Sequence, residues 1–517
     1  MFKINKEARK STSGHIDEIL TLPNNTAPIW YKDPGLRKLQ VWIFVVFFSQ
    51  ICTGFDASNT SNLQAFASWK TMLGNPDSSQ LGIITSIYFM GCLAGSIPCG
   101  MFADRFGRKL GLLLGQVLTV IGAAIQASSY TYAQYLCARF IMGVGIASIT
   151  NSGPAMLFEL AHPRMKGTLV SLFNPFWYVG SIVCAATAFG TTHMSVTNSM
   201  GWRIPSFIQG VFPLVCIPFT IFMPESPSYL IVRGKKEQAL ATLAKYHSNG
   251  DLNDPLVLKE VDDIEVAILN SKDTQSYKQI LSHKPHRKRF MVITIMTLMA
   301  LWSGQSIITF YFTSILELVG INNPSKQTGI NTGLNVMNLV SSVLGAYVSA
   351  RVGRRPMWML SIIGMIVVNI PFTALTAEYA KTNSVNVAYG VIVMLFLYDF
   401  SYNIACNPLL YSYTTELLPF SIRAKGLAWK NLVGQVALII NMYVNPIALA
   451  KITWKYYIFY MCLNLVWLTL VYFLFPETLG LTLEELSRLF EEDRLGSIGD
   501  IESDGVDQIH VTELGKK

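Results

Sequence analysis

Four charged side chains stand inside long apolar stretches of this sequence, at Asp56, Arg139, Asp399 and Lys430. A charge at the centre of a lipid bilayer costs at least about 2.5–3.5 kcal/mol, so each of these residues needs a reason to be there. A buried carboxyl can carry a proton, because burial opposes its ionisation while a nearby arginine favours it. Asp56 and Arg139 therefore form a candidate pair for binding and releasing a proton, and a static structural ion pair is the alternative.

The depth of each charge limits which pairs can form. Asp56 and Arg139 each lie about seven residues from the outer end of their apolar stretches, which places both about 10 Å below the outer boundary. Asp399 lies near the middle of its stretch, with no cation at matching depth, whereas Lys430 is close enough to a boundary to extend its ammonium into water. For Asp399, a protonated carboxyl, a structural hydrogen bond to a neighbouring helix and a place in a cavity all stay open.

The elements that hold these charges are apolar helices. The chain has 517 residues, of which 51% are hydrophobic and 14% charged, and its mean hydropathy is +0.38. Soluble globular proteins have about 25% charged residues, so this composition excludes a soluble enzyme, a disordered chain and a coiled coil. The apolar residues form blocks of about 20–28, each long enough to cross a bilayer as a helix. The fold class predicted is an all-α membrane protein with twelve transmembrane helices. The expected spans are 39–63, 79–102, 109–128, 132–158, 166–190, 203–223, 289–317, 327–350, 356–377, 386–415, 422–448 and 453–475.

Lysine and arginine are concentrated in alternate joints between the spans. By the positive-inside rule, those joints and the tails are cytoplasmic, and this explains the net charge of +8 without a nucleic-acid partner. The predicted organisation is a cytoplasmic N-terminal tail (1–38), a six-helix bundle (39–223), a cytoplasmic central loop with short helices (224–288), a second six-helix bundle (289–475) and a cytoplasmic C-terminal tail (476–517). None of the eight cysteines has metal-site spacing, and we expect neither a metal nor a cofactor.

The two halves of the sequence repeat three features. The segment 100–109 is echoed by 345–354, the glutamate and lysine of 159–166 by the glutamate and arginine of 416–423, and the Pro-Glu-Ser segment after residue 223 by Pro-Glu-Thr after residue 475. Two pseudo-symmetric bundles are therefore expected, an arrangement that transporters use with a midplane site between halves that rock against each other.

The repeated charges fall at the cytoplasmic ends of the expected spans. A carboxylate there can pair with a cation seven residues further on, and such pairs can latch the cytoplasmic face in one state and break in another. Ordinary interfacial anchoring by cations is the alternative. Ala350 stands where the first copy has Asp104, so the second latch is expected to be weaker. The latch candidates are Asp104, Arg105, Arg108, Glu159, Lys166, Arg351, Arg354, Glu416 and Arg423.

These residues resemble the sugar porter family of the major facilitator superfamily over about residues 40–490. The matching elements include GFD (54–56), GMFADRFGRK (100–109), RFIMGVG (139–145), PESPSYL (224–230) and PETLGLTLEEL (476–486). WSGQSIITFYF (302–312) and ELLPFSIRAKG (416–426) look most like the fungal lactose and disaccharide permease branch. The resemblance implies a single-chain plasma-membrane carrier that imports a sugar by alternating access, often with a proton. It also implies that Asp56 and Arg139 are the proton-coupling pair.

The expected sugar site departs from the family pattern. Ala300 and Leu301 occupy the family's two glutamine positions in the seventh span, and Ser306 its asparagine position. Either the substrate is not a common hexose, or other polar groups bind it. Asn335, Asn338 and Asn441 are possible replacements, with interhelical hydrogen bonding as their alternative role. The candidate substrate-binding residues are Asn174, Gln305, Ser306, Tyr311, Tyr411 and Asn335.

Three functions stay open at this point. The leading one is proton symport of a sugar, with a disaccharide as one candidate, by a chain that works as a monomer in the bilayer. The second is a carrier for another polyol or small organic solute. The third is a sensor that binds sugar but transports little. No pair of nucleophile and base, metal cluster or nucleotide-binding loop supports an enzyme.

Overall fold

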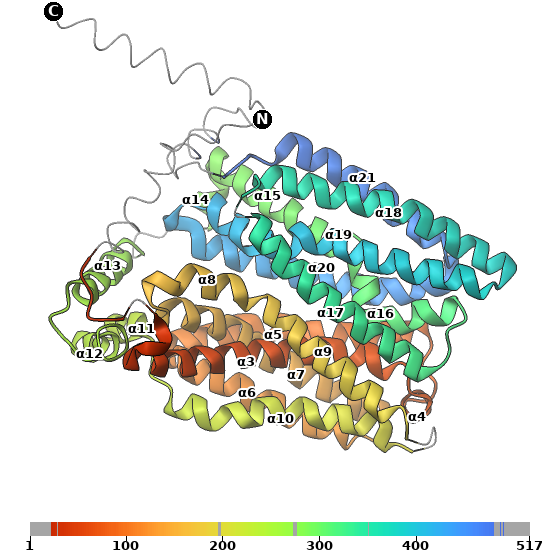
Figure 1. The fold of residues 1–517 in the computed structure, drawn as a ribbon, viewed down its shortest axis with the longest axis horizontal. Coiled ribbons are helices and arrows are strands. Elements are labelled where there is room, and N and C mark those ends of the chain that lie inside the picture. Colours follow the sequence, from red (N-terminus) through yellow and green to blue (C-terminus); the bar gives the residue numbers. More distant parts are fainter. Residues whose placement is uncertain are drawn as a thin grey trace, which may run out of the picture.

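The structure is a computed structural model that describes residues 22–27, 29–194, 198–271, 277–349, 351–479, 486 and 490. Most of the two predicted tails, and Ala350, lie outside these residues. Within the described ranges the chain forms helices and no strands. The helices fall into two groups that occupy separate layers, one from each half of the sequence (Figure 1).

The first group begins after a single 3-10 turn, η1 (Trp30–Lys32). Its helices start at polar residues that can accept hydrogen bonds from free backbone amides: Asp33 caps the first long helix, Asp77 the second and Thr131 the fourth. The helices are α3 (Pro34–Leu63), α4 (Ala67–Met72), α5 (Ser78–Phe106), α6 (Arg108–Ala127), α7 (Tyr132–Leu160), α8 (Pro163–Phe173), α9 (Pro175–Thr191) and α10 (Met200–Phe222).

Four helices precede the second group and lie in the central segment that was predicted to contain short helices. These are α11 (Pro227–Val232), α12 (Lys236–His247), α13 (Pro255–Ser271) and α14 (Tyr277–Ser282). The second group consists of α15 (Lys284–Leu301), α16 (Gln305–Leu318), α17 (Pro324–Ser349), α18 (Arg354–Thr382), α19 (Val385–Leu417), α20 (Phe420–Ile452) and α21 (Lys455–Leu474). The four short helices mark one end of the molecule, here termed the loop face, and α4 lies at the opposite end, the far face (Figure 1).

Ten helical spans in the described residues are long and apolar enough to cross a membrane, and an eleventh is the bent pair α8–α9, which kinks by 47°. The span expected at 289–317 is broken into α15 and α16 around Gly304, whose backbone is left-handed. The span expected at 327–350 is the long helix α17, but it is not among the apolar ones. The physical reason is its row of polar side chains, which includes Asn331, Asn335 and Asn338.

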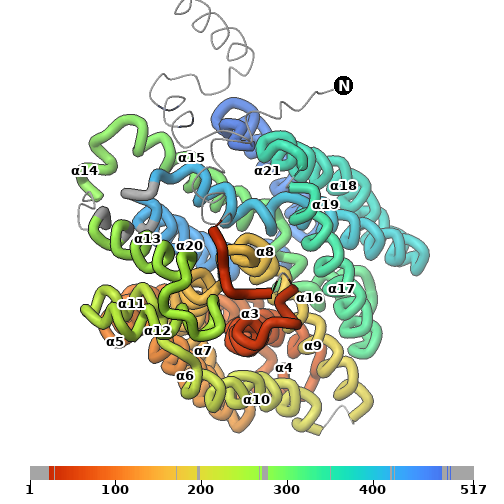
Figure 2. Tube along the Cα trace, turned by 60° about the vertical axis from the view of Figure 1, so that its left-hand side comes forward, coloured from red at the N-terminus to blue at the C-terminus, as the bar shows by residue number. Residues whose placement is uncertain are grey.

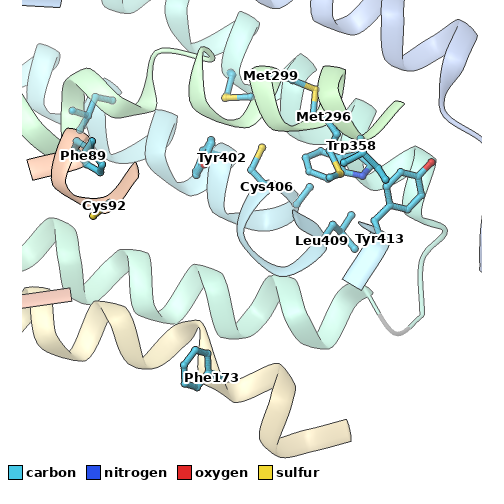
Figure 3. Packing of buried hydrophobic residues seen from close by; sticks show 14 of the residues in the cluster. Phe89, Cys92, Phe173, Met296, Met299, Trp358, Tyr402, Cys406, Leu409 and Tyr413 are labelled. Atoms are coloured by element: carbon cyan, nitrogen blue, oxygen red, sulfur yellow. The ribbon is translucent and has the colours of Figure 1, made fainter. Parts of the chain in front are cut away.

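The two groups contact each other along three helix pairs: α3 with α16, α5 with α20, and α9 with α17. Figure 2 shows the molecule with the loop face turned forward, where α11 and α12 lie against the first group, α13 packs against α11 and α12, and α14 lies beside α15. Aliphatic, aromatic and sulfur-containing side chains fill the second group, where Cys406 and Leu409 of α19 gather with Met296 of α15 and Trp358 of α18 (Figure 3).

Candidate functional site

Asp56 and Arg139 are both buried inside the first helix group, Asp56 with 0% and Arg139 with 2% of its surface exposed. Neither oxygen of Asp56 has a hydrogen-bond partner among the described residues. The guanidinium of Arg139 lies 4.6 Å from the ring centroid of Tyr88 and acts electrostatically on the Asp56 carboxyl without a direct ion pair in the described part of the chain. This arrangement holds an acid away from lipid, within electrostatic reach of a cation, with both carboxyl oxygens unpartnered among the described residues.

A polar cavity lies between the two helix groups, where α9 packs against α17. It is small and partly open in this state, with room for about one water molecule. Its walls come from α3, α9, α16, α17 and α19, so both halves of the sequence contribute. The lining residues are Ser58, Trp177, Tyr178, Ser181, Ile308, Thr309, Asn331, Leu334, Asn335, Asn338 and Asp399. Hydroxyls, amides and one aromatic indole together suit a polyhydroxylated molecule with apolar C–H faces.

Asp399 is part of a hydrogen-bonded chain at this cavity. Its Oδ2 accepts a hydrogen bond of 2.8 Å from the amide of Asn338, whose own oxygen accepts one of 3.0 Å from Asn403. The hydroxyl of Tyr178, in the first helix group, donates to Asn403 at 2.6 Å. Asp399 Oδ1 has no partner among the described residues. Asp399 therefore bonds a neighbouring helix and also lines the cavity.

A second chain of hydrogen bonds crosses the same cavity nearer the far face. Ser58 and Ser181 bond each other at 2.5 Å, and Ser181 donates to Asn335 at 2.7 Å. Asn335 in turn donates to Asn331 at 3.1 Å, and Asn331 donates to Asn62 of α3 at 2.8 Å. The polar stripe of α17 is thus joined to both α3 and α9 of the other half.

The predicted substrate-binding residues lie in different places. Asn335 lines the cavity, and Gln305 reaches it indirectly, because its amide donates to the cavity residue Thr309 at 2.6 Å. Ser306 donates to the carbonyl of Leu301 at 2.9 Å, across the break between α15 and α16. Tyr311 is fully buried and donates to the carbonyl of Met442 at 2.5 Å.

The two remaining predicted residues are not among those that line the described cavity. Asn174 sits at the joint between α8 and α9, where the bent span changes direction. Tyr411 lies three helical turns beyond Asp399 on α19 and is half exposed, and its ring covers the buried ammonium of Lys430 at 3.2 Å. Asn441, considered as a cavity residue, instead donates to the Leu301 carbonyl at 2.8 Å, which is its alternative structural role.

Sequence reasoning missed Ser58, Tyr178, Ser181 and Thr309. Small hydroxyl side chains are common in membrane helices and give no distinct signal one at a time. The polar residues of α17 recur every three or four positions, and that helical stripe was the available indication of a polar cavity.

The expected latch residues cluster at the loop face, but their pairing differs from the one that sequence spacing suggests. Glu159 lies 4.0 Å from Arg108 rather than pairing with Lys166, and the hydroxyl of Ser226 donates to it. Arg108 also pairs with Asp104 one turn earlier. The ammonium of Lys166 lies 3.5 Å from the ring of Phe158 instead.

Arg105 enters this cluster through its backbone. Its carbonyl accepts a hydrogen bond of 3.1 Å from the hydroxyl of Tyr229, on α11. Its guanidinium carbon lies 5.7 Å from the ring of Phe106.

The second half repeats this cluster with its own residues. Glu416 accepts bonds from Arg354 at 2.9 and 3.2 Å, and Thr478 takes the place of Ser226 as the hydroxyl donor. Arg423 donates to the carbonyl of Leu418 at 3.3 Å, and Arg351 lies 4.2 Å from the ring of Tyr347.

A glutamate caps the same helix start in each half. Glu225 accepts from the backbone amide of Lys109 at 3.2 Å, and Glu477 accepts from the amide of Arg354 at 2.8 Å. An anion at a helix N-terminus accepts hydrogen bonds from free backbone amides and interacts favourably with the positive end of the helix dipole. The repeated Pro-Glu-Ser and Pro-Glu-Thr segments therefore close onto the repeated glycine-arginine joints, a role that sequence reasoning did not assign.

Comparisons with known proteins agree with this architecture. A family model described as "Sugar (and other) transporter" matches residues 42–490. The low-affinity glucose transporter HXT3 of Saccharomyces cerevisiae is 28% identical over 504 residues, which cover 92% of this chain and 85% of the relative. The MFS-type transporter oryC of Aspergillus oryzae is 26% identical over 470 residues, 88% of this chain and 86% of that one.

Solved structures give the same fold. The inward-open xylose transporter XylE from E. coli superposes with a TM-score of 0.73 at 20% sequence identity, covering 87% of this chain and 99% of that chain. The fold is that of an all-α major facilitator. Because the family model spans most of the sequence and the relatives are transporters rather than enzymes, this chain belongs to the sugar (and other) transporter family, as a multi-pass membrane carrier of sugar.

Proposed function

We propose that this carrier imports its sugar together with a proton across the plasma membrane, with the loop face and both tails in the cytoplasm. The observation that carries the proposal is the buried Asp56 carboxyl, which has no hydrogen-bond partner in the described residues and lies within electrostatic reach of Arg139. A static structural ion pair would bring the two groups into contact. The related fold of XylE is described as that of a proton:xylose symporter, at 21% identity and a TM-score of 0.71.

The closed far face supports a carrier that alternates between two openings. Hydrogen bonds join the halves there: Gln64 donates to the carbonyl of Phe310 at 3.0 Å, and Thr313 donates to the carbonyl of Ser61 at 2.9 Å. Thr192 and Ser325 bond at 2.7 Å. In this state sugar and proton leave toward the loop face. The return stroke breaks these bonds and reopens the cavity to the outside. The loop-face clusters around Glu159 and Glu416 stay within their own halves in this state, and they latch the loop face by exchanging partners when the halves move.

The proton supplies the driving force. Each proton that enters across 100 mV contributes about 2.3 kcal/mol, which is enough to concentrate a neutral sugar several tens of times. Asp56 and Arg139 lie in the same half, on α3 and α7. If a shift between these two helices during transport changes their distance, Asp56 takes a proton when far from the guanidinium and loses it when close.

The relatives and the residues of the cavity point to different classes of sugar. Several of the relatives are named as glucose or hexose transporters. Ala300 and Leu301, however, remove the amides that the family pattern places in the seventh span. The polar groups of the cavity come instead from α3, α9, α17 and α19. We therefore retain a disaccharide beside the hexoses and pentoses as the transported sugar.

Uptake in a transporter-deficient yeast tests the proposal. Labelled D-glucose, D-xylose, lactose and maltose are supplied with and without a protonophore. We expect accumulation of at least one sugar that the protonophore abolishes. Asp56→Asn should abolish uphill accumulation and leave exchange of internal for external sugar. The matched control is Asp262→Asn, at an exposed aspartate of α13, which should behave as the wild type.

Each contrary outcome has a distinct meaning. Uptake that ignores the protonophore would replace symport by facilitated diffusion, and acid-dependent accumulation in Asp56→Asn would remove the coupling role of that residue. If the protein reaches the cell surface and moves none of these sugars, the sensor or the carrier of another solute takes its place.

A further inference from the structure

We propose that Asp399 is a substrate-recognition carboxyl of the central cavity, whose Oδ1 accepts a hydrogen bond from a hydroxyl of a bound neutral sugar. This inference rests on the proposed function, since it names how the same cavity selects its substrate. Asp399 is 1% exposed, lines the cavity between the two helix groups, and comes from α19, one turn before Asn403.

The two oxygens of Asp399 differ in their surroundings. Oδ2 is held by the amide of Asn338 at 2.8 Å, which fixes the plane of the carboxyl. Oδ1 is buried and has no partner in the described part of the chain. A buried acceptor without a partner costs about 1–3 kcal/mol, so a purely structural role would be expected to use both oxygens. A ligand hydroxyl in the cavity would satisfy the remaining one.

The chemistry of the walls selects the class of ligand. Among the residues that line the cavity, Asp399 is the one ionisable acid, and none is lysine, arginine or histidine. The other polar groups are hydroxyls and amides, and the indole of Trp177 offers an apolar face. A carboxyl oxygen that can accept a hydrogen bond, among groups that can both donate and accept, matches a neutral molecule rich in O–H donors.

The position of Asp399 also connects the ligand to the contact between the halves. Asn338 joins Asp399 to Asn403, and Asn403 accepts the hydroxyl of Tyr178 from α9 at 2.6 Å. A sugar that binds Oδ1 is therefore connected to the hydrogen-bonded chain that joins the two helix groups. The same residues therefore contact the substrate and join the two halves.

The variant Asp399→Asn tests the inference with little change of shape. The amide oxygen keeps the bond from Asn338, while the NH₂ group replaces the acceptor at Oδ1 with a donor. Equilibrium binding is measured on the purified full chain with D-glucose, D-xylose and lactose, followed by the monodeoxy analogues of whichever sugar binds most tightly. We expect Kd to rise about ten- to a hundredfold, the loss typical of a hydrogen bond to a charged acceptor.

The deoxy series provides a readout that a structural role would not move. One analogue should bind wild type more weakly than the parent sugar and bind Asp399→Asn as well as the parent does, because the lost hydroxyl no longer has an acceptor to meet. Ser401→Ala, at a half-buried serine of the same helix that is not among the residues lining the cavity, is the control and should keep the wild-type profile. Should Asp399→Asn fail to reach the membrane, Asp399→Ser, which removes both oxygens without adding volume, is measured in the same way.

The outcomes separate this inference from the proposed function. An unchanged Kd and an unchanged deoxy profile in the Asp399 variant would overturn the inference while sugar transport stands. Tighter binding of D-glucosamine than of D-glucose, lost in Asp399→Asn, would overturn the assignment of a neutral ligand. If wild type binds none of the three sugars, the proposed function is overturned, and the inference with it.

Discussion

Tyr411 and Lys430 form a contact that accounts for a cation in the second helix group. The ammonium of Lys430, which is 3% exposed, lies 3.2 Å from the centroid of the Tyr411 ring. The face of an aromatic ring carries negative charge, and a desolvated cation over it gains about 2 kcal/mol or more. The expectation that Lys430 reaches water was wrong for this structure, because Tyr411 covers it.

This contact predicts a loss of stability on removal of the ring. Tyr411→Leu should lower the melting temperature of the purified protein by several degrees, because Lys430 loses the ring that stabilises its charge. Tyr411→Phe keeps the ring and should melt near wild type. If Tyr411→Leu instead weakens sugar binding at unchanged stability, the Tyr411 ring contacts the substrate, as its selection as a candidate substrate-binding residue predicts.

The residues found from sequence share one property, and those missed lack it. Asp56, Arg139 and Asp399 are charged residues in apolar stretches. Because a charge in lipid costs free energy, each of them can be picked out from the sequence as a candidate functional residue. Ser58, Tyr178 and Ser181 carry hydroxyl groups, which cost little free energy to bury and are common in membrane helices. Only the three-dimensional structure shows that they line one cavity. The family positions around Ser306 and Tyr311 misled for a different reason: the break at Gly304 turns these side chains toward backbone carbonyls.

At the scale of elements, glycines set how closely α3 and α9 approach. A Cβ built on Gly180 would lie 2.0 Å from the carbonyl oxygen of Ile51, and one on Gly54 would lie 1.9 Å from that of Trp177. Both distances are far below van der Waals contact with backbone that cannot move aside. Because Trp177 lines the cavity, this close crossing also sets the shape of the site.

Substitution of Gly180 should therefore separate α3 from α9. We expect Gly180→Ala to reduce the yield of folded protein and to cost about 1–3 kcal/mol of stability, the range for overpacking. Gly190→Ala, near the end of the same helix, meets nothing within 4 Å and should be close to neutral. Fluorescence-detected size exclusion after heating compares the two, and equal losses in both would contradict the packing argument.

The helices themselves were largely predictable, and the exceptions have physical causes. Long apolar runs such as α5 and α18 follow from hydropathy, because only a helix satisfies its backbone in lipid. The length of α17 was predicted, but hydropathy alone would pass over it, since one side of the helix is polar for the cavity. The breaks after Leu301 and at Asn174 depend on tertiary packing around Gly304 and Pro175, which periodicity does not reveal.

A buried histidine joins α12 to the end of α7. His247 bonds the carboxylate of Glu260, on α13, at 2.8 Å and the carbonyl of Leu160 at 3.1 Å. Burial lowers the pKa of His247, but the Glu260 charge and these two hydrogen bonds outweigh it, so the pKa stands above the usual 6.5. Both bonds are made fully only by the protonated ring, which donates from both nitrogens.

The raised pKa predicts how the loop-face helices respond to pH. A histidine with a raised folded pKa adds stability that is complete below pH 6.5 and is lost as pH rises through the folded value. Glu260→Gln removes the charge that raises it, so the variant should melt below wild type at pH 6, and the gap should close toward pH 9. A gap that stays constant over this range would assign the loss to packing.

At the scale of the whole molecule, the two halves differ in how they meet at the two faces. At the far face Lys70 of α4 pairs with Glu317 of α16 at 2.7 Å, and both side chains are about one-third exposed. At the loop face the clusters around Glu159 and Glu416 each stay within one half and its adjoining segment. The repeated sequence predicted these clusters, but repetition within each half carries no information about contacts between halves, so the far-face pair was not predicted.

The pair of Lys70 and Glu317 predicts a shift between the two openings of the carrier. An exposed ion pair contributes about 0.2–1 kcal/mol, so its loss changes the ratio of the two states by at most about fivefold. Glu317→Gln removes a bond present only when the far face is closed, and should therefore increase the fraction of molecules open at that face. Distances between spin labels on α4 and α16 report this fraction directly. The double exchange Lys70→Glu with Glu317→Lys restores the attraction and should return the wild-type distribution, and the shift should shrink as salt screens the pair. If Glu317→Gln leaves the distribution unchanged at low salt, the far face is held closed by the buried hydrogen bonds of α3 and α16 alone.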